Sequence, residues 1–399
     1  MSLVVRGGRI QSTVIRRFAI LLSISHVGAL KMIVALFVGF RIAYSVFGFF
    51  FPSAVPLSSS LPPEVAPYIH LHDTGISAKL LGIWQRWDAG WFEKIATVNY
   101  LPFDRAVAFP PLYPALMHLV GRVLDNNFAL AGLLISGLSF IFAMFGLYLL
   151  VAEEWDEQVA KRTIVYLSIF PTAFYLFAPY AEAIFLALVV WTFFFARRGR
   201  WGWVLVLSSC AAVTRSPGVL LAVPLAWEML SQWRNGRRSW LALVVPASPP
   251  VSFLVFIGFS RLITGWSYFQ SIATWQTTQP PLWTAIATSW RFILATGNPV
   301  EALNLGLLLA AFAVLIIGMK RIPFIYTLYV ASQLLLIGSR YNPFTPLMSS
   351  ARYLLVVFPL FIVLAIVLRS RFAQLVWLSI SVSLLILLFS LFLVGGFVA

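Results

Sequence analysis

The chain is poor in charged residues and in cysteine. Only 10% of its 399 residues are Asp, Glu, Lys or Arg, whereas soluble proteins carry roughly a quarter. Its one cysteine, Cys210, can build neither a disulfide framework nor a thiolate metal site. The four histidines show no familiar zinc spacing, so we expect no metal and no cofactor. These scarcities exclude a soluble globular enzyme, a disordered protein and a nucleic-acid-binding protein.

Hydrophobic residues are abundant instead, at 61% of the chain. At about 20 residues per crossing, they predict an all-α polytopic membrane protein with about eleven transmembrane helices. The predicted spans are 31–51, 128–151, 163–179, 182–196, 201–214, 217–230, 240–259, 302–319, 323–338, 353–368 and 374–396. Segments 201–214 and 217–230 are short for a crossing, and we expect a hairpin that turns within the outer half of the membrane.

The basic residues predict the orientation. The net charge is +15, and short Lys/Arg clusters fall on alternate connections. These clusters are at 6–17, 161–162, 197–200, 234–238, 320–321 and 369–371. By the positive-inside rule they are cytoplasmic, together with the N-terminus. The connections 52–127, 260–300 and 339–352 are then extracytoplasmic, in the plasma membrane of a prokaryote or the endoplasmic reticulum of a eukaryote.

Segment 80–99 in the first outer connection is rich in tryptophan. At 100° per residue it predicts one amphipathic helix along the membrane interface. Its apolar arc holds Trp84, Trp87 and Trp91, and its polar face holds Glu93 and Lys94.

Asp88 lies in the middle of that apolar arc. A carboxylate there is desolvated, which raises its pKa unless a positive charge is paired with it. The structural alternatives for Asp88 are a helix cap or a salt bridge to Arg86 or Lys94. However, the side chains of Arg86 and Lys94 project from other faces of the predicted helix. We therefore favour Asp88 as a catalytic carboxylate.

Other polar residues mark the outer ends of the predicted spans. Tyr113, in the proline-rich segment 108–114, is a possible polar contact. Glu182 begins a predicted span, where either a cap or a contact with an acceptor or a cation would suit the helix dipole.

Three arginines lie at or near membrane depth, where charge is costly and often functional. Arg215 sits in the predicted hairpin turn, and Arg340 and Arg352 flank the last outer connection. Guanidinium groups suit bidentate phosphate contacts. The alternatives are an ion pair with Glu182 for Arg215 and interfacial snorkelling for the other two.

Two motifs follow one another in the first outer connection: RWDAGWF at 86–92 and AFPPLYP at 108–114. They resemble the WDAxxFxxIAxxGY and AFFPxxP signatures of the GPI mannosyltransferase 2 (PIG-V) family. Segment 171–185 and the turn 214–218, TRSPG, resemble its next blocks, and 351–354, ARYL, gives a weaker match. Asn99, Pro111 and Pro217 depart from the family pattern.

The resemblance implies a GT-C glycosyltransferase fold with Asp88 as the catalytic base. It implies transfer of a hexose, usually mannose, from a polyprenyl- or dolichyl-phosphate sugar to a hydroxyl of a glycolipid or glycan at the extracytoplasmic face, with inversion. Arg352, Arg215 and Arg340 are the expected donor-phosphate ligands. Acceptor or supporting contacts are expected from Glu182, Tyr113, Arg86, Trp87 and Trp91. A short chain without a glycosylation sequon favours a prokaryotic homologue.

Two further expectations concern organisation and the rival function. We expect one polytopic domain over 1–399, with a catalytic module at 1–230 (outer loop 52–127) and variable helices at 231–399 (outer loops 260–300 and 339–352). A flippase or transporter of lipid-linked sugars is the alternative, because it would use the same arginines and a membrane cavity.

Overall fold

The computed structural model describes residues 24–51, 61–72 and 74–398. The basic N-terminal cluster and the start of the first outer connection lie outside this range. Within it the protein is helical, and the one β-bridge joins Thr278 and Tyr341.

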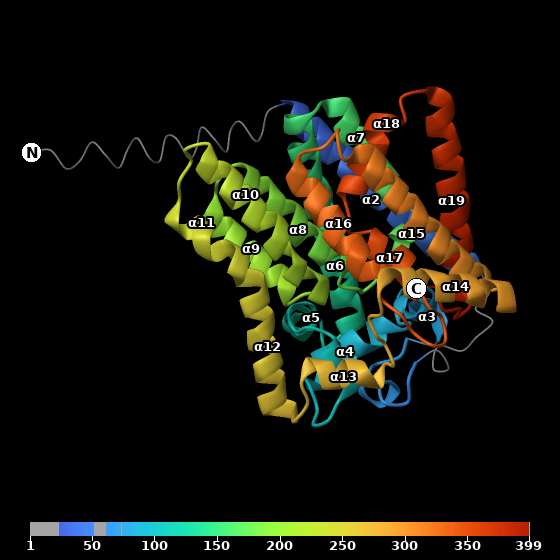
Figure 1. The fold of residues 1–399 in the computed structure, drawn as a ribbon. Helices are drawn as coiled ribbons and strands as arrows, with labels where there is room; N and C mark the ends of the chain where they lie inside the picture. The colour runs from blue at the N-terminus through green and yellow to red at the C-terminus, as the bar shows by residue number, and fades with distance from the viewer. Residues whose placement is uncertain (1–23, 52–60, 73, 399) are drawn as a thin grey trace, which may run out of the picture.

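In the described residues, five helical segments are long and apolar enough to cross a membrane on their own. They are α2 (Ile24–Phe50), α6 (Phe128–Glu154), α11 (Trp240–Val244) continued by η7 (Val245–Ala247) and α12 (Ser248–Thr264), α15 (Pro299–Gly318), and α19 (Arg371–Leu393). In Figure 1 these helices run between the upper and lower ends of the molecule, and the basic connections lie at the upper end. The chain is a multi-pass membrane protein.

The remaining predicted spans are shorter helices that stop inside the molecule. They are α7 (Glu157–Ser168), η5 (Ala173–Leu176), α8 (Glu182–Arg197), α9 (Trp201–Ala212), η6 (Ser216–Leu221), α10 (Ala222–Arg234), α16 (Phe324–Gly338), α17 (Ser350–Leu354) and α18 (Pro359–Val367). A 12-residue helix such as α7 or α9 is about 18 Å long, against roughly 30 Å of hydrocarbon. Their inner ends therefore place polar residues within the protein rather than at its surface.

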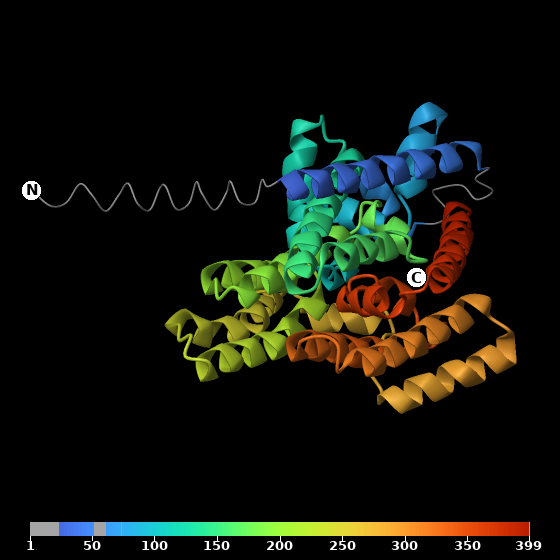
Figure 2. The same ribbon diagram turned by 90° about the horizontal axis from the view of Figure 1, so that it is seen from above.

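The outer connections fold into short helices at the lower end of Figure 1. The first contains η2 (Ala66–Tyr68), α3 (Gly75–Leu80), η3 (Gly82–Trp84), α4 (Asp88–Val98), η4 (Arg105–Ala108) and α5 (Leu112–Val123). The second contains α13 (Tyr268–Thr274) and α14 (Leu282–Thr296). Seen from above, α14 and α15 form the edge of the molecule opposite α2 (Figure 2).

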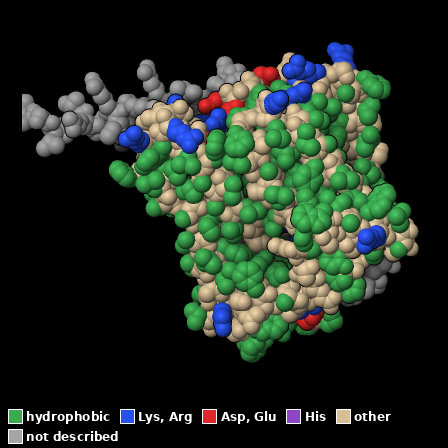
Figure 3. Space-filling model, in the orientation of Figure 1, with side chains coloured by type: hydrophobic (Ala, Val, Ile, Leu, Met, Phe, Trp, Pro, Cys, Tyr) green, Lys and Arg blue, Asp and Glu red, His purple; other side chains and the backbone are tan. Residues whose placement is uncertain are grey.

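The surface fits a membrane setting. Hydrophobic side chains cover the middle of the face drawn in Figure 3, and most of its Lys and Arg side chains gather along the upper edge. Leu254, Val255 and Leu262 on α12 are exposed, which would be unfavourable in water. This belt is the expected surface of a protein solvated by lipid.

The single amphipathic helix expected over 80–99 is wrong. The chain forms η3, breaks, and begins α4 only at Asp88, because Trp87 adopts a φ of 53°. The expectation that Glu93 and Lys94 form an exposed polar face is also wrong. Glu93 accepts a hydrogen bond from the Gln85 amide (2.8 Å), and Lys94 pairs with Asp104 (2.9 Å), all four being buried.

Candidate active site

A cavity of about 770 Å³ lies where the outer connections meet the inner ends of the short helices. Its lining includes Asp88, Glu182, Arg215, Arg340 and Arg352, which come from five separate segments of the chain. The structure thus brings together the predicted carboxylates and all three predicted arginines.

Asp88 is the first residue of α4, where the helix dipole favours a negative charge. Its side chain is 24% exposed, and its Oδ2 lies 2.6 Å from Nη2 of Arg352. The positive φ of Trp87 turns the chain sharply just before this helix. Asp88 is therefore an oriented carboxylate that faces an open space.

Glu182 is the first residue of α8 and is almost completely buried, with 1% of its side chain exposed. It forms ion pairs with Arg215 and, at 2.8 Å, with Nε of Arg352. Neither contact has hydrogen-bond geometry. Buried charges require such pairing, since an unpaired one would carry a large desolvation cost. The pair with Glu182 is the alternative that the sequence left open for Arg215.

Arg352 bridges the two carboxylates. Burial opposes its charge, but the negative charges of Asp88 and Glu182 outweigh burial and hold its pKa well above the ordinary value. It remains a guanidinium at every physiological pH. A phosphate at this position would have to compete with both carboxylates.

Arg340 differs from the other two arginines. Its guanidinium contacts the Tyr353 hydroxyl and lies over the Tyr353 ring, 4.9 Å from the centroid. Among the described residues no carboxylate pairs with it, and its buried Nε has no partner. The described site has two carboxylates and three arginines in close proximity, so it carries one uncompensated positive charge, which resides on Arg340.

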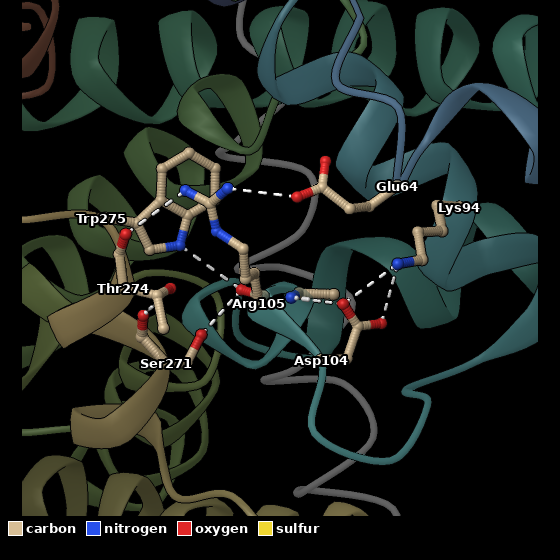
Figure 4. Close-up of polar contacts among 8 residues, drawn as sticks. Glu64, Lys94, Asp104, Arg105, Ser271, Thr274 and Trp275 are labelled. Atoms are coloured by element: carbon tan, nitrogen blue, oxygen red, sulfur yellow. Dashed lines mark hydrogen bonds and ion pairs between the residues drawn. The ribbon is translucent and has the colours of Figure 1, made fainter.

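The second outer connection closes the cavity over the first, and Arg105 joins them (Figure 4). The Arg105 carbonyl accepts hydrogen bonds from Ser271 Oγ (2.7 Å) and Trp275 Nε1 (3.5 Å). Its guanidinium lies 4.3 Å from the Trp275 ring centroid and 3.3 Å from Glu64. Arg105 is therefore held on both sides.

Four predicted site residues lie outside the cavity lining. Tyr113 is buried and donates to the Gly132 carbonyl (3.1 Å). Arg86 is buried, and its carbonyl accepts from the Tyr180 hydroxyl (2.8 Å). Trp91 stacks on Phe109, and Trp87 packs edge-on against Phe397. These four residues therefore support the walls of the cavity from behind instead of lining it.

The sequence reading missed several lining residues in the two later outer connections. Trp275, Asn342 and Phe344 line the cavity beside Arg105. The signal available was compositional: residues 274–279, TWQTTQ, are uncharged and polar around one tryptophan in an otherwise apolar half of the chain. No group of three or more His, Cys, Asp or Glu side chains that could hold a metal occurs in the part of the chain described.

Comparison with known proteins bears on the fold. No protein-family model and no curated protein sequence matches the chain. Among solved structures, it is similar to the crystal structure of ArnT from Cupriavidus metallidurans bound to undecaprenyl phosphate, with a TM-score of 0.53 and 14% identity. The match covers 87% of this chain and 63% of ArnT, so the chain spans less than two thirds of that protein's length. At this identity the likeness concerns the fold, and it shows that the chain is an all-α polytopic protein with the GT-C fold.

Proposed function

We propose that the protein is an integral-membrane glycosyltransferase that moves a hexose from a polyprenyl- or dolichyl-phosphate sugar to a hydroxyl of a glycolipid or glycan acceptor. The single observation that carries this proposal is the oriented Asp88 carboxylate in a cavity that also holds three arginines. The GT-C fold supports the class of reaction, and the motif resemblance supports mannose as the sugar.

Asp88 is the proposed general base. It takes the proton of the acceptor hydroxyl while that oxygen forms a bond to the anomeric carbon from the face opposite the phosphate. The bond from the anomeric carbon to the phosphate oxygen breaks, and its electron pair leaves with the lipid phosphate. The outcome is inversion, and base catalysis of this kind contributes roughly 10²–10⁴ in rate.

The arginines have separate proposed tasks. Arg340, without a carboxylate, is best suited to the donor phosphate, because a guanidinium can meet a phosphate with two hydrogen bonds. Arg352 orients Asp88 and Glu182, and Arg215 neutralises Glu182. Phosphate binding by Arg352 and Arg215 stays a prediction. This ranking differs from the sequence expectation, which placed Arg340 last.

The test is transfer in vitro from radiolabelled polyprenyl-phosphate-mannose to a mixture of membrane lipids and glycosides, using purified protein in nanodiscs. The expected result is a labelled product that forms only with protein and donor together. A flippase instead predicts movement of the intact lipid-linked sugar across proteoliposomes with no labelled product. Translocation of the intact lipid-linked sugar without any labelled product would overturn the glycosyltransferase proposal.

A further inference from the structure

One wall of the cavity is polar but uncharged, unlike the wall around Asp88. We name it the amide wall: Thr274, Gln276, Thr277, Thr278, Gln279, Asn342 and Thr345. Two aromatic residues that also line the cavity, Phe269 and Phe344, are 64% and 71% exposed. The wall therefore combines hydroxyl and amide groups with accessible ring faces.

The backbone of the amide wall is fixed by contacts between two distant segments. Thr278 and Tyr341 exchange backbone hydrogen bonds of 2.9 Å each way, which is the β-bridge of the fold. The Asn342 amide donates to the Trp275 carbonyl (3.1 Å) and its oxygen accepts from the Phe344 amide (2.9 Å). A ligand of this wall would meet a surface that is already formed, which lowers the entropy cost of binding.

Two side chains on the amide wall have unused hydrogen-bonding capacity. Gln276 and Gln279 are exposed, and within the described residues their side-chain amides make no hydrogen bond with the protein. Each amide offers two donors and an acceptor. Hydroxyl groups, which both donate and accept, match that set.

The charges near the amide wall are already neutralised. Arg105 is the charged lining residue beside Trp275, and it is held by Glu64 and by the Trp275 ring. Arg340, two residues before Asn342, has no carboxylate partner, but its guanidinium contacts Tyr353 and is the proposed ligand of the donor phosphate. No other lining guanidinium or carboxylate in the described residues lacks an ion-pair partner. An uncharged ligand is therefore favoured at this wall.

We propose that the amide wall binds an uncharged saccharide. Its assignment as the sugar head of the acceptor rests on the proposed function. Hydroxyls would bond to Gln276 and Gln279, and the apolar C–H face of a pyranose would pack on Phe344 or Phe269. Pockets commonly pair apolar ring contacts with a few placed polar groups. The anionic phosphate then belongs to the arginine wall, and the neutral sugar to the amide wall.

The test compares three acceptors with labelled donor: a neutral alkyl glycoside, the same glycoside phosphorylated, and a serine-containing peptide. The variants are the double substitution Gln276→Leu/Gln279→Leu and Phe344→Ala. Gln158→Leu, at an exposed cytoplasmic glutamine, and Phe103→Ala, 66% exposed outside the cavity lining, are the matched controls. The expected result is an acceptor KM raised about 10-fold or more by the double substitution, with the donor KM unchanged within about two-fold. Both controls should behave as wild type.

Several outcomes would overturn the inference. One is an unchanged acceptor KM in the double variant, and another is better use of the phosphorylated glycoside or of the peptide. Equal effects of Phe344→Ala and Phe103→Ala would mark Phe344 as a membrane-interface anchor only. Saturation-transfer NMR of the alkyl glycoside separates the two proposals: binding that the double variant abolishes, in a protein that transfers no sugar, would sustain the amide wall and refute the glycosyltransferase.

Discussion

Among the described residues, arginine and carboxylate side chains gather at both ends of the helices. At the C-terminal ends of α6 and α8, Arg197 lies 2.6 Å from Glu154 and 3.2 Å from Glu228. Gln232 completes that cluster by donating to Glu228 (2.8 Å) and to the Ala196 carbonyl (2.7 Å). None of these residues lines the cavity, and the one arginine is satisfied by two carboxylates.

The outer cluster uses the same residue types with a different result. Its arginines outnumber its carboxylates, Asp88 is partly exposed, and the whole group faces the cavity. Buried ion pairs alone are weak evidence of function, because they also hold helices together. The comparison teaches that an opening onto the cavity and an excess of arginines over carboxylates, rather than the presence of ion pairs, distinguish the candidate site from the cluster around Arg197.

The largest expected effect tests whether the two clusters lie on opposite sides of the membrane. In a Cys210→Ser background, cysteine at exposed Ser77 should react with an impermeant thiol reagent in intact cells. Cysteine at exposed Asn235, near the Arg197 cluster in the chain, should react only after permeabilisation. The basic connections set this orientation. The reverse pattern would place Asp88 in the cytoplasm and end the extracytoplasmic assignment.

Asp88→Asn and Glu228→Gln should break the two clusters in different ways. Asp88→Asn removes the proposed base, so turnover should fall by at least about 10² with little change in Tm. Glu228→Gln weakens a buried pair far from the cavity, so Tm should fall while specific activity is retained. Transfer assays and thermal unfolding measure both. Near-normal turnover of Asp88→Asn would refute its role as base.

Substitutions of Arg340 and Arg352 should separate donor binding from base orientation. Arg340→Gln should raise the donor KM about 10-fold or more, since a charge-assisted hydrogen bond contributes roughly 1.5–3 kcal/mol. Arg352→Lys should mainly lower kcat, because its bridge between Asp88 and Glu182 is lost. Arg321→Gln, at an exposed arginine between α15 and α16 and outside the cavity lining, is the control. A donor KM that responds to Arg352 but not to Arg340 would reverse the proposed tasks.

The smallest expected effect concerns Glu93, a buried carboxylate that belongs to neither cluster. It has a glutamine rather than an arginine as partner, and burial raises its pKa to about 7. The folded state therefore keeps the proton over a pH range in which the unfolded chain has lost it. Stability should fall as the pH rises from about 4.5 to about 7. Glu93→Gln should flatten that part of the Tm–pH curve, and an unchanged curve would contradict the assignment.

The sequence predicted the helical class, the five long spans and five of the lining residues, because apolar runs and scattered intramembrane charges are local signals. The other six predicted spans are shorter helices. Asp88 stood out within a single segment. The break at Trp87 and the burial of Glu93 were not predicted, since a helical wheel assumes a continuous helix. The pair of Glu182 with Arg215 was among the alternatives, but the partner of Asp88 was not predicted. Asp88 and Arg352 are 264 residues apart, and spacing along the chain carries no information about such a contact.

That separation has a consequence for the synthesis of the protein. At 5–20 residues per second, roughly 10–50 s pass between the emergence of Asp88 and that of Arg352. Throughout this interval the Asp88 carboxylate lacks the guanidinium that pairs with it, and the later outer connections are still being made. The candidate site is therefore complete only when the chain has been inserted as far as Arg352. A ribosome stalled before that point would leave an inert chain in the membrane rather than a partly active one.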